Sequence, residues 1–468
     1  MIRFGTDGWR AVISEEFTFD NVRKVSQAIA DYYSSQSPND PRPFVVGYDT
    51  RFLSDAYAKL VSEVLAGNGF EVILSDHSVP TPAVSVCIAK RQLRAGIMVT
   101  ASHNPPQYNG IKIKDESGGP APNEVTQQIE QLIGMNSIKS ISIESAKTEK
   151  KIHLLDLSKE HIKAIHSYID LKALKKKRFR VLVDAMHGAS DSLIEKVLAG
   201  TPIRVTTIRS EINPSFGGNG PEPILKNLGE MTFRMKEGAF DLGIVNDGDA
   251  DRIGAMRPDG RLITASEIMA LLALHFIEGR CWRGSLVKTV SCSFLLDRIA
   301  EKYGLEIYET PIGFKNISKI MREQNVLIGG EESGGIGVKN YIPERDGVLL
   351  GLLLLEMMAY RNAGIIQIMD VMEKEYGRFY YLREDIPFPS DESKEFLENQ
   401  KEKTPKDLLG RKIVQVKDQN GIKWICEDGS WLLLRFSGTE SLLRIYAEAD
   451  ALKRTKDLIQ YGRQLAHS

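Results

Sequence analysis

The sequence predicts an α/β fold of three similar mixed α/β domains plus a C-terminal α+β domain, arranged around a central active-site cleft. The first observation is the length of 468 residues, which exceeds what one hydrophobic core supports. The second is a succession of strand, helix and strand that occurs three times and ends each time in an unusual polar loop. The third is a change of pattern over roughly the last 95 residues, where short strands precede one final helix.

The composition is that of an ordinary globular protein, with 26% charged and 42% hydrophobic residues. A net charge of −1 argues against nucleic acid or an anionic membrane as the main partner. The four cysteines are scattered without C-x-x-C spacing, and no signal-peptide pattern is present, so we expect a reducing, cytoplasmic location. The longest apolar run, Val348 to Met358, is too short to span a bilayer and predicts a buried helix.

The first unit places a serine directly after a predicted buried strand. Ser102 lies in the loop Thr100–Pro106, directly after the apolar run Ala95–Val99. The carboxyl end of such a strand is where α/β proteins bind ligands. No G-x-S-x-G elbow encloses the serine, so a hydrolase nucleophile is not indicated. The other predicted elements of this unit are strands at 44–47 and 71–74 and a helix at 54–65.

The second and third units repeat this order. The second ends in the loop Asn246–Arg252 and the third in the loop Gly329–Gly335. Three such units indicate internal duplication, and chance similarity between α/β segments is the alternative. The second unit comprises strands at 180–183, 203–207 and 241–245 with helices at 192–198 and 225–236. The third comprises strands at 285–288, 306–308 and 325–328 with helices at 295–303 and 317–323.

The C-terminal region has a pattern of its own, and a polar stretch at 136–151 indicates a boundary nearer the start. Strands are predicted at 412–416, 431–436 and 443–447, followed by a helix at 450–464. We therefore divide the chain into domains at residues 1–150, 151–254, 255–370 and 371–468.

Asp247, Asp249 and Asp251 alternate along one loop, so three carboxylates can converge on a hard cation. A Ca²⁺ loop does not fit, because its sixth position would be Arg252 and its twelfth Pro258. Mg²⁺ bound together with a phosphate oxygen fits better, and an acidic surface turn is the alternative. Arg252 can serve as a salt-bridge partner of the aspartates, as a phosphate ligand, or as both.

Two further loops contain groups that bind phosphate or sugar. The loop Arg435–Glu440 offers an arginine, two hydroxyls and a glycine backbone, the parts of a phosphate cradle, although S-G-T is also an ordinary turn. The P-loop spacing is absent from the chain. Glu331 and Ser333 could bind sugar hydroxyls, and a glycine-flanked acidic turn is as plausible.

Two residues near Ser102 are candidate acid/base groups. Lys112 follows a turn into a short strand, and burial beside a cation would lower its pKa and suit it to proton transfer. A solvated surface lysine is the alternative. His103 is either an acid/base or a hydrogen-bonded structural residue.

These loops together resemble the α-D-phosphohexomutase family, which includes phosphoglucomutases, phosphomannomutases and phosphoglucosamine mutases. The motif Phe4–Arg10 resembles the family's N-terminal motif, and Thr100–Pro105 its phosphoserine loop. Asp247–Arg252 resembles its metal loop, Gly330–Gly335 its sugar loop, and Arg435–Thr439 its phosphate-binding loop. The resemblance covers essentially the whole chain in the right order.

The resemblance implies the activity of an isomerase that passes a phosphoryl group between Ser102 and a hexose phosphate through a 1,6-bisphosphate. One Mg²⁺ per chain is implied, held by Ser102, Asp247, Asp249 and Asp251, with glucose 1,6-bisphosphate as activator. The implied catalytic residues are Ser102, His103, Lys112, Arg10 and Arg252. The implied substrate-binding residues are Lys288, Glu331, Ser333, Arg435, Ser437, Gly438 and Thr439. We expect hexose phosphates as ligands and a monomer or small homo-oligomer.

The end of the sugar loop bears on the choice of sugar. Members that accept both mannose and glucose phosphates, and glucosamine mutases, commonly carry histidine where this chain has Gly335. The sugar loop and the segment Thr310–Lys315 resemble those of glucose-preferring members, and Thr100 stands where glucosamine mutases typically have serine. We therefore expect a phosphoglucomutase, with mannose phosphates also accepted. The alternatives are a glucose 1,6-bisphosphate synthase, a phosphoglucosamine mutase and a non-catalytic sugar-phosphate binding protein.

Overall fold

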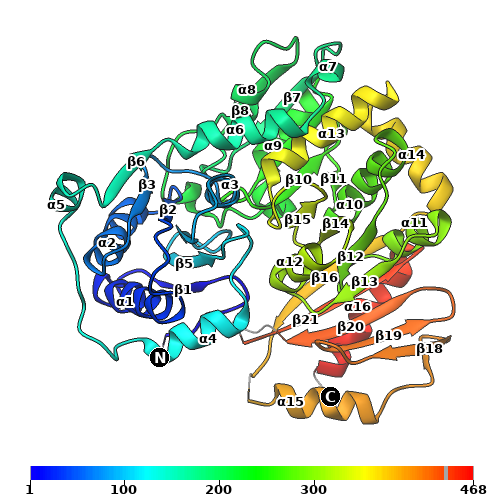
Figure 1. Ribbon diagram of the computed structural model, residues 1–468. Helices are drawn as coiled ribbons and strands as arrows, with labels where there is room; N and C mark the ends of the chain where they lie inside the picture. The colour runs from blue at the N-terminus through cyan, green and yellow to red at the C-terminus, as the bar shows by residue number, and fades with distance from the viewer. Residues whose placement is uncertain (1, 390, 437–440, 467–468) are drawn as a thin grey trace.

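The computed structural model describes residues 2–389, 391–436 and 441–466. Four sheets follow one another along the chain, and each carries its own helices (Figure 1). The first three domains are α/β/α layers, and the last has an antiparallel sheet. The predicted fold class is confirmed.

The first sheet has the order β1-β5-β4-β2-β3-β6. Its central strands are parallel and buried except at Tyr48, which explains their unbroken apolar sequences. Helices α1 and α2 pack on one face, and α3 packs on the other through Val84 and Ile88. The elements are β1 (Trp9–Val12), α1 (Phe19–Gln36), β2 (Phe44–Tyr48), α2 (Ser54–Gly67), β3 (Val72–Ser75), α3 (Thr81–Arg91), β4 (Ala95–Val99), β5 (Tyr108–Lys114), α4 (Asn123–Leu132), α5 (Ile143–Thr148) and β6 (Ile152–Leu155).

The second sheet has the order β11-β10-β9-β7-β8, in which β7 is parallel to both β8 and β9. Its strand β9 ends at the aspartate loop, as predicted. The elements are α6 (Leu157–Tyr168), α7 (Leu171–Leu174), β7 (Arg180–Asp184), α8 (Leu193–Val197), β8 (Arg204–Ile208), α9 (Gly229–Glu237), β9 (Leu242–Asn246), β10 (Ile253–Met256) and β11 (Leu262–Ile263).

The third sheet has the order β13-β12-β14-β15. The predicted apolar helix is α13, whose side chains are buried in one continuous core shared with the second sheet. Its N-terminus is capped by Asp346, which accepts a hydrogen bond from Leu349 N at 3.0 Å. The elements are α10 (Ala265–Leu274), β12 (Ser285–Thr289), α11 (Leu295–Tyr303), β13 (Ile307–Thr310), α12 (Phe314–Glu323), β14 (Val326–Gly330), β15 (Ile336–Val338), α13 (Gly347–Arg361) and α14 (Ile365–Tyr376).

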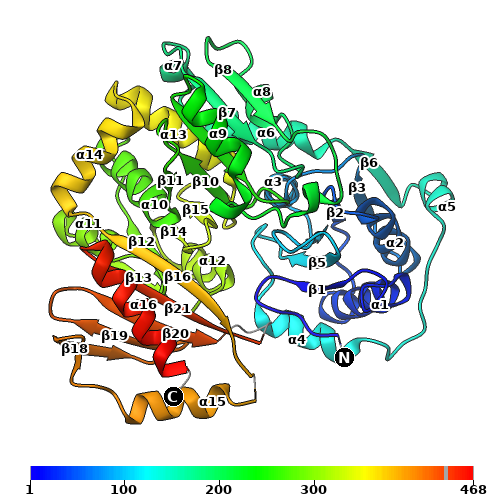
Figure 2. The same ribbon diagram turned by 180° about the vertical axis from the view of Figure 1, so that it is seen from behind.

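The fourth sheet is antiparallel, with the order β16-β21-β20-β19-β18-β17, and α16 packs across it (Figure 2). Its apolar residues Trp431 and Tyr446 form one cluster with Val290 of the loop after β12, so this domain docks on the third. The elements are β16 (Tyr380–Pro387), α15 (Ser393–Glu402), β17 (Asp407–Leu408), β18 (Arg411–Lys417), β19 (Ile422–Cys426), β20 (Trp431–Phe436), β21 (Leu442–Ala449) and α16 (Leu452–Ala466).

Two edge strands lie beyond the domain limits expected from the sequence. β6 pairs with β3 of the first sheet although it follows residue 150, and β11 pairs with β10 of the second sheet although it follows residue 254. Among the described helices, none alone combines the length and apolar composition of a bilayer span. α13 and α14 satisfy that test only as a pair, with an 82° bend between them.

Candidate active site

The loops after β4 and β9 meet between the first and second domains. Ser102 Oγ donates a hydrogen bond to Asp247 Oδ2 at 2.8 Å, and Thr81 Oγ1 donates to Asp249 Oδ2 at 2.5 Å. A methyl group on Gly248 would lie 2.6 Å from Ser102 O, so glycine permits this close approach of the two backbones. The sequence-predicted serine and aspartate loops are thus brought together.

Asp247, Asp249 and Asp251 are fully buried, and each offers a carboxylate oxygen within 4.8 Å of the others. This burial excludes the alternative of an acidic surface turn. Burial and the two neighbouring carboxylates raise the pKa of Asp247 well above its ordinary value. Asp249 Oδ1 and Asp251 Oδ1 have no hydrogen-bond partner among the described residues. Two buried oxygens without partners beside a third carboxylate are the donor set that suits a hard divalent cation.

Lys112 is 1% exposed, so it is not the solvated surface lysine of the alternative interpretation. Its Nζ donates to Asp249 Oδ2 and Asp251 Oδ2, each at 2.7 Å, and lies 2.9 Å from Asp7 Oδ2. Burial acts to lower the pKa of Lys112, but these carboxylates outweigh it and raise the pKa. Without a cation at the aspartates, the lysine therefore faces three anions that favour its charged form.

Three basic residues surround Ser102. Arg10 Nη1 donates to Asn104 Oδ1 at 2.7 Å. Arg252 Nε lies 3.7 Å from Asp247 Oδ2 and 3.9 Å from Asp251 Oδ1, yet within the described chain it makes no hydrogen bond. It therefore pairs with the aspartates and still has a donor to offer. His103 Nδ1 lies 3.4 Å from Ser102 Oγ, and burial together with nearby arginines holds the pKa of its imidazole well below the ordinary value.

The loop Glu331–Gly335 lies between β14 and β15. Glu331 Oε1 accepts a hydrogen bond from Gly313 N at 3.0 Å, and burial raises the pKa of this carboxyl to about 7. Ser333 is half-buried in the same turn. Lys288, at the end of β12, is 1% exposed, and its amine pairs with Asp297 and lies 3.8 Å from Glu309 Oε2. These partners within the described chain belong to the third domain, and the lysine is not brought to the serine or aspartate loops by a hydrogen bond or ion pair.

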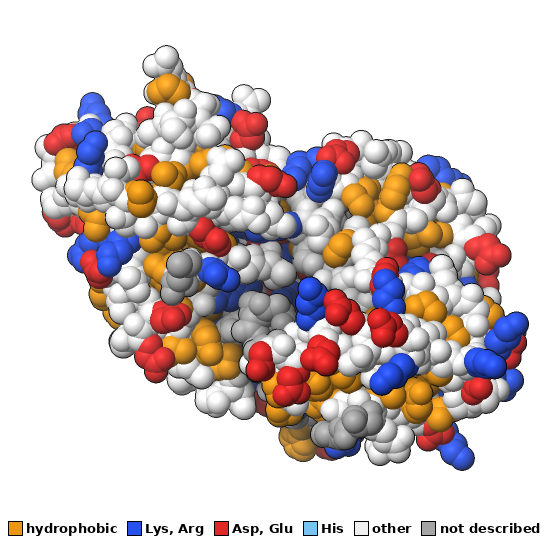
Figure 3. Space-filling model, turned by 90° about the horizontal axis from the view of Figure 1, so that it is seen from below, with side chains coloured by type: hydrophobic (Ala, Val, Ile, Leu, Met, Phe, Trp, Pro, Cys, Tyr) orange, Lys and Arg blue, Asp and Glu red, His pale blue; other side chains and the backbone are white. Residues whose placement is uncertain are grey.

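Arg435 is the penultimate residue of the fourth-domain strand β20. Its Nε donates to Asn420 Oδ1 at 3.1 Å, and the same oxygen accepts from Ile312 N of the third domain at 3.3 Å. Its buried Nη1 has no partner in the part of the chain that the structure describes. Figure 3 shows this face of the molecule hollowed between the first and fourth domains, with blue Lys and Arg side chains inside the hollow. The predicted residues Ser437, Gly438 and Thr439 lie outside the described residues.

Arg345, which the sequence did not indicate, links three domains at the site. Its Nη2 lies 2.6 Å from Asp7 Oδ2 and 2.7 Å from Asp251 Oδ2, and its Nη1 lies 4.0 Å from Glu331 Oε2. A methyl group on Gly335 would lie 2.5 Å from Arg345 Cδ. Arg345 thus occupies the space that a side chain at position 335 would need.

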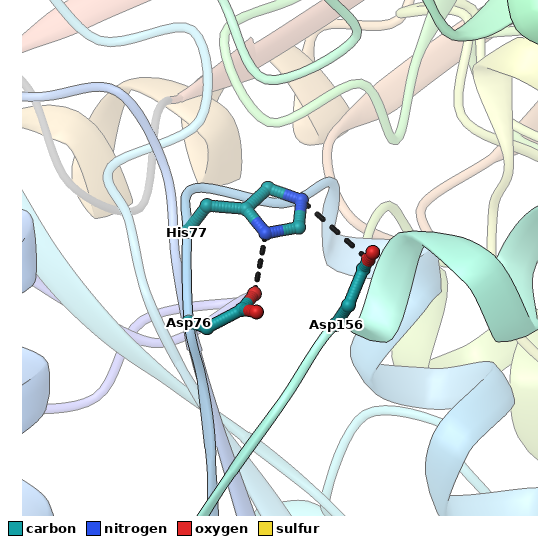
Figure 4. Close-up of side chains that lie close together, drawn as sticks. All are labelled: Asp76, His77 and Asp156. Carbon is teal, nitrogen blue, oxygen red and sulfur yellow. Dashed lines mark hydrogen bonds and ion pairs between the residues drawn. The ribbon is translucent and has the colours of Figure 1, made fainter.

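A second cluster of potential metal ligands lies at the surface, where His77 stands between Asp76 and Asp156 (Figure 4). Nδ1 of the imidazole lies 2.5 Å from Asp76 Oδ1 and Nε2 lies 3.8 Å from Asp156 Oδ1. Asp156 also caps α6 through Ser158 N. Both ring nitrogens therefore already face a carboxylate.

Comparison with known proteins places these loops in a family. Models described as phosphoglucomutase/phosphomannomutase alpha/beta/alpha domains I, II and III match residues 1–138, 159–260 and 264–376, and the C-terminal domain model matches residues 397–461. The "Phosphoglucosamine/phosphogalactosamine mutase" of Sulfurisphaera tokodaii is 30% identical over 95% of both chains. The "Phosphoglucomutase/phosphomannomutase" of Thermococcus kodakarensis is 30% identical over 99% of this chain and 98% of its own. The crystal structure of a putative phosphomannomutase from Thermus thermophilus matches with a TM-score of 0.88 and 34% identity, over 100% of this chain and 99% of that one.

Proposed function

The chain belongs to the phosphoglucomutase/phosphomannomutase family and is a phosphohexomutase, and we propose that it interconverts glucose 1-phosphate and glucose 6-phosphate through a phosphorylated Ser102. One observation carries the proposed role of the serine. Ser102 Oγ is 2.8 Å from Asp247 in a buried group of three carboxylates, two of which keep an oxygen without a partner among the described residues.

We propose Mg²⁺ as the cation of this group, one per chain. Asp247, Asp249, Asp251 and an oxygen of a phosphoryl group on Ser102 would hold it. The buried, convergent carboxylate oxygens support this assignment. When bound, Mg²⁺ neutralises negative charge on the phosphoryl oxygens.

The proposed reaction exchanges one P–O bond for another. The bond from phosphorus to Ser102 Oγ breaks while a bond to a hydroxyl oxygen of the hexose monophosphate forms, which yields a 1,6-bisphosphate. The proton of that hydroxyl ends on Ser102 Oγ, and we assign its delivery to His103 Nδ1, 3.4 Å away. Lys112 is held in its charged form, so it stabilises charge, together with Arg10 and Arg252, and does not accept a proton.

The non-reacting phosphate needs a second holding site at the other end of the sugar. Arg435 offers a buried nitrogen without a partner among the described residues, and Ser437, Gly438 and Thr439 complete the proposed cradle. Glu331 and Ser333 would bind the sugar hydroxyls, and Lys288 would approach from the third domain. The bisphosphate then turns within the cleft and returns its other phosphoryl group to Ser102. Added glucose 1,6-bisphosphate acts as an activator because it phosphorylates Ser102.

Glucose is the proposed sugar because the sugar loop ends in Gly335, where Arg345 leaves no room for a side chain. The second candidate is glucosamine phosphate, favoured by the name of the Sulfurisphaera tokodaii relative. A bisphosphate synthase is the third, since it needs the same serine. Each candidate predicts a different product, so they are separable by assay.

The test measures turnover of the 1-phosphates of glucose, mannose, glucosamine and N-acetylglucosamine, each with Mg²⁺ and a trace of the corresponding bisphosphate. We expect glucose to give the highest kcat/KM and intact-mass analysis to show phosphate on the wild-type protein but not on Ser102→Ala. Full activity of Ser102→Ala would disprove the assignment of the serine. A higher kcat/KM for glucosamine, or release of bisphosphate as the main product, would disprove the assignment of the sugar or of the reaction.

A further inference from the structure

Arg51 lies between β2 and α2, and its side chain binds backbone carbonyls in and directly after the loop that contains Ser102. Its Nη1 donates to Pro105 O and Tyr108 O, each at 2.9 Å. Its Nη2 donates to Ser102 O at 2.7 Å and to Asn104 O at 2.6 Å. The side chain is completely buried, so these four carbonyls take up its terminal N–H groups without competition from solvent.

The backbone of Ser102 needs such support. Its φ is +53°, in the left-handed region that costs a residue other than glycine roughly 1–2 kcal/mol. Its N–H donates to Thr100 Oγ1 at 2.8 Å, and that hydroxyl donates to Asp49 Oδ2 at 2.6 Å. Asp49 in turn lies 3.3 Å from Arg51 Nε. The two peptide groups of Ser102 are therefore held by one connected network, through Thr100 on the N–H side and through Arg51 on the carbonyl side.

The second domain closes over this network. Phe216 covers the Arg51 guanidinium with its ring centroid 4.9 Å from Cζ. Thr50 Oγ1 donates to His187 O at 2.8 Å. The aspartate loop approaches the same Ser102 carbonyl that Arg51 binds, since a methyl group on Gly248 would lie 2.6 Å from it. Any shift of that carbonyl would therefore change the distance between the serine and the aspartates.

We propose that Arg51 is a positioning residue, which fixes Ser102 in its left-handed conformation so that Oγ and its phosphoryl group face the aspartate loop. The inference rests on the proposed function, in which Ser102 carries the phosphoryl group. Lysine cannot replace the arginine, because its single ammonium has three N–H donors on one atom, whereas Arg51 donates four hydrogen bonds from two nitrogens. Transfer depends on alignment of the reacting atoms, and a 1 Å displacement costs about 100-fold in rate.

The test compares Arg51→Lys with Arg94→Lys. Arg94 is a matched control, because it is 4% exposed and binds backbone carbonyls of the same domain, at Ser37 O (2.7 Å) and Asp40 O (3.0 Å), without contacting the serine loop. We expect kcat of Arg51→Lys to fall about 100-fold with little change in KM, because the serine and not the sugar is displaced. The rate at which glucose 1,6-bisphosphate phosphorylates the protein should fall in parallel. Arg94→Lys should keep kcat within about threefold, because misplacement of the reacting atoms is absent.

A second pair of variants covers the case in which Arg51→Lys does not fold. Thr100→Val removes the acceptor of the Ser102 N–H and should lower kcat about tenfold, as the loss of one hydrogen bond of ~1.4 kcal/mol would, whereas Thr100→Ser keeps the hydroxyl and should restore it. Wild-type kcat in Arg51→Lys or in Thr100→Val would overturn the inference, as would a loss that matches Arg94→Lys. An inactive wild-type protein without phosphate on Ser102 would instead overturn the proposed function beneath it.

Discussion

Replacing Gly335 by alanine tests how tightly the loop between β14 and β15 packs against Arg345. The new methyl group would lie 2.5 Å from Arg345 Cδ and 3.3 Å from its Cγ, against an ordinary carbon–carbon contact of about 3.5–4.0 Å. Arg345 has no room to yield, because its guanidinium lies 2.6 Å from Asp7 and 2.7 Å from Asp251. The position has no positive φ, so alanine meets no backbone penalty and the effect is purely steric.

Relieving this overlap needs a displacement of about 1 Å, and overpacking of this kind costs roughly 1–3 kcal/mol. If this free energy is lost by displacing Arg345 and the residues around it from their catalytic positions, kcat/KM decreases about 5- to 150-fold. We would measure kcat/KM for glucose 1-phosphate beside the thermal midpoint. Gly229→Ala is the matched control, because a methyl group there meets nothing within 4 Å.

A double-mutant cycle with Arg345→Met identifies the cause. If the methyl group acts through Arg345, the double variant should be no worse than Arg345→Met alone, since neighbouring residues couple. Wild-type activity of Gly335→Ala, or simple addition of the two effects, would refute the reasoning.

Three other predictions concern charge. Glu331 has its pKa raised to about 7, so KM should fall as pH rises through 7 if the charged carboxylate binds sugar hydroxyls, and Glu331→Gln should flatten that profile. The raised pKa also means that the contribution of Glu331 to stability is fully present below about pH 4.5 and is lost as pH rises to about 7. Glu344→Gln should lower the free energy of unfolding by about 3–5 kcal/mol, because it leaves Lys114 buried and unpaired, whereas Asp20→Asn in an exposed pair should cost under about 1 kcal/mol; equal shifts in urea titrations would contradict this. EDTA should abolish turnover and Mg²⁺ restore it, and Asp249→Asn should raise the Mg²⁺ concentration required; turnover unaffected by EDTA would exclude the proposed metal.

Much of the site follows from where strands end. The runs at Ala95–Val99 and Asp241–Val245 predict buried strands, and the polar loops after them meet as expected. Arg51 also follows the end of a buried strand, because it comes directly after β2, the parallel neighbour of the strand β4 that Ser102 follows. Helix α1 also has a readable pattern, with Val22, Val25 and Ile29 at helical spacing.

Other features depend on tertiary contacts that no local pattern encodes. Arg345 lies seven residues beyond the end of β15, and its partner Asp7 lies 338 positions away in the sequence. The pKa of Lys112 could not be predicted, because its direction depends on three carboxylates from two distant segments. The edge strand β6 has exposed side chains at His153 and Leu154, which removes the apolar signal of a strand.

The long-range pairs have a consequence for how the protein is made. Lys114 is synthesised 230 positions before its partner Glu344, and Asp7 is synthesised 338 positions before its partner Arg345. At a synthesis rate of about 5–20 residues per second, the second delay is roughly 15–70 s. During that time Lys114 lacks Glu344 and Asp7 lacks Arg345, although Asp7 can pair with Lys112 of its own domain. A nascent chain therefore contains Ser102 well before Asp247, Asp249, Asp251 and Arg345, and the proposed site is complete only after synthesis has also passed the loop at Arg435.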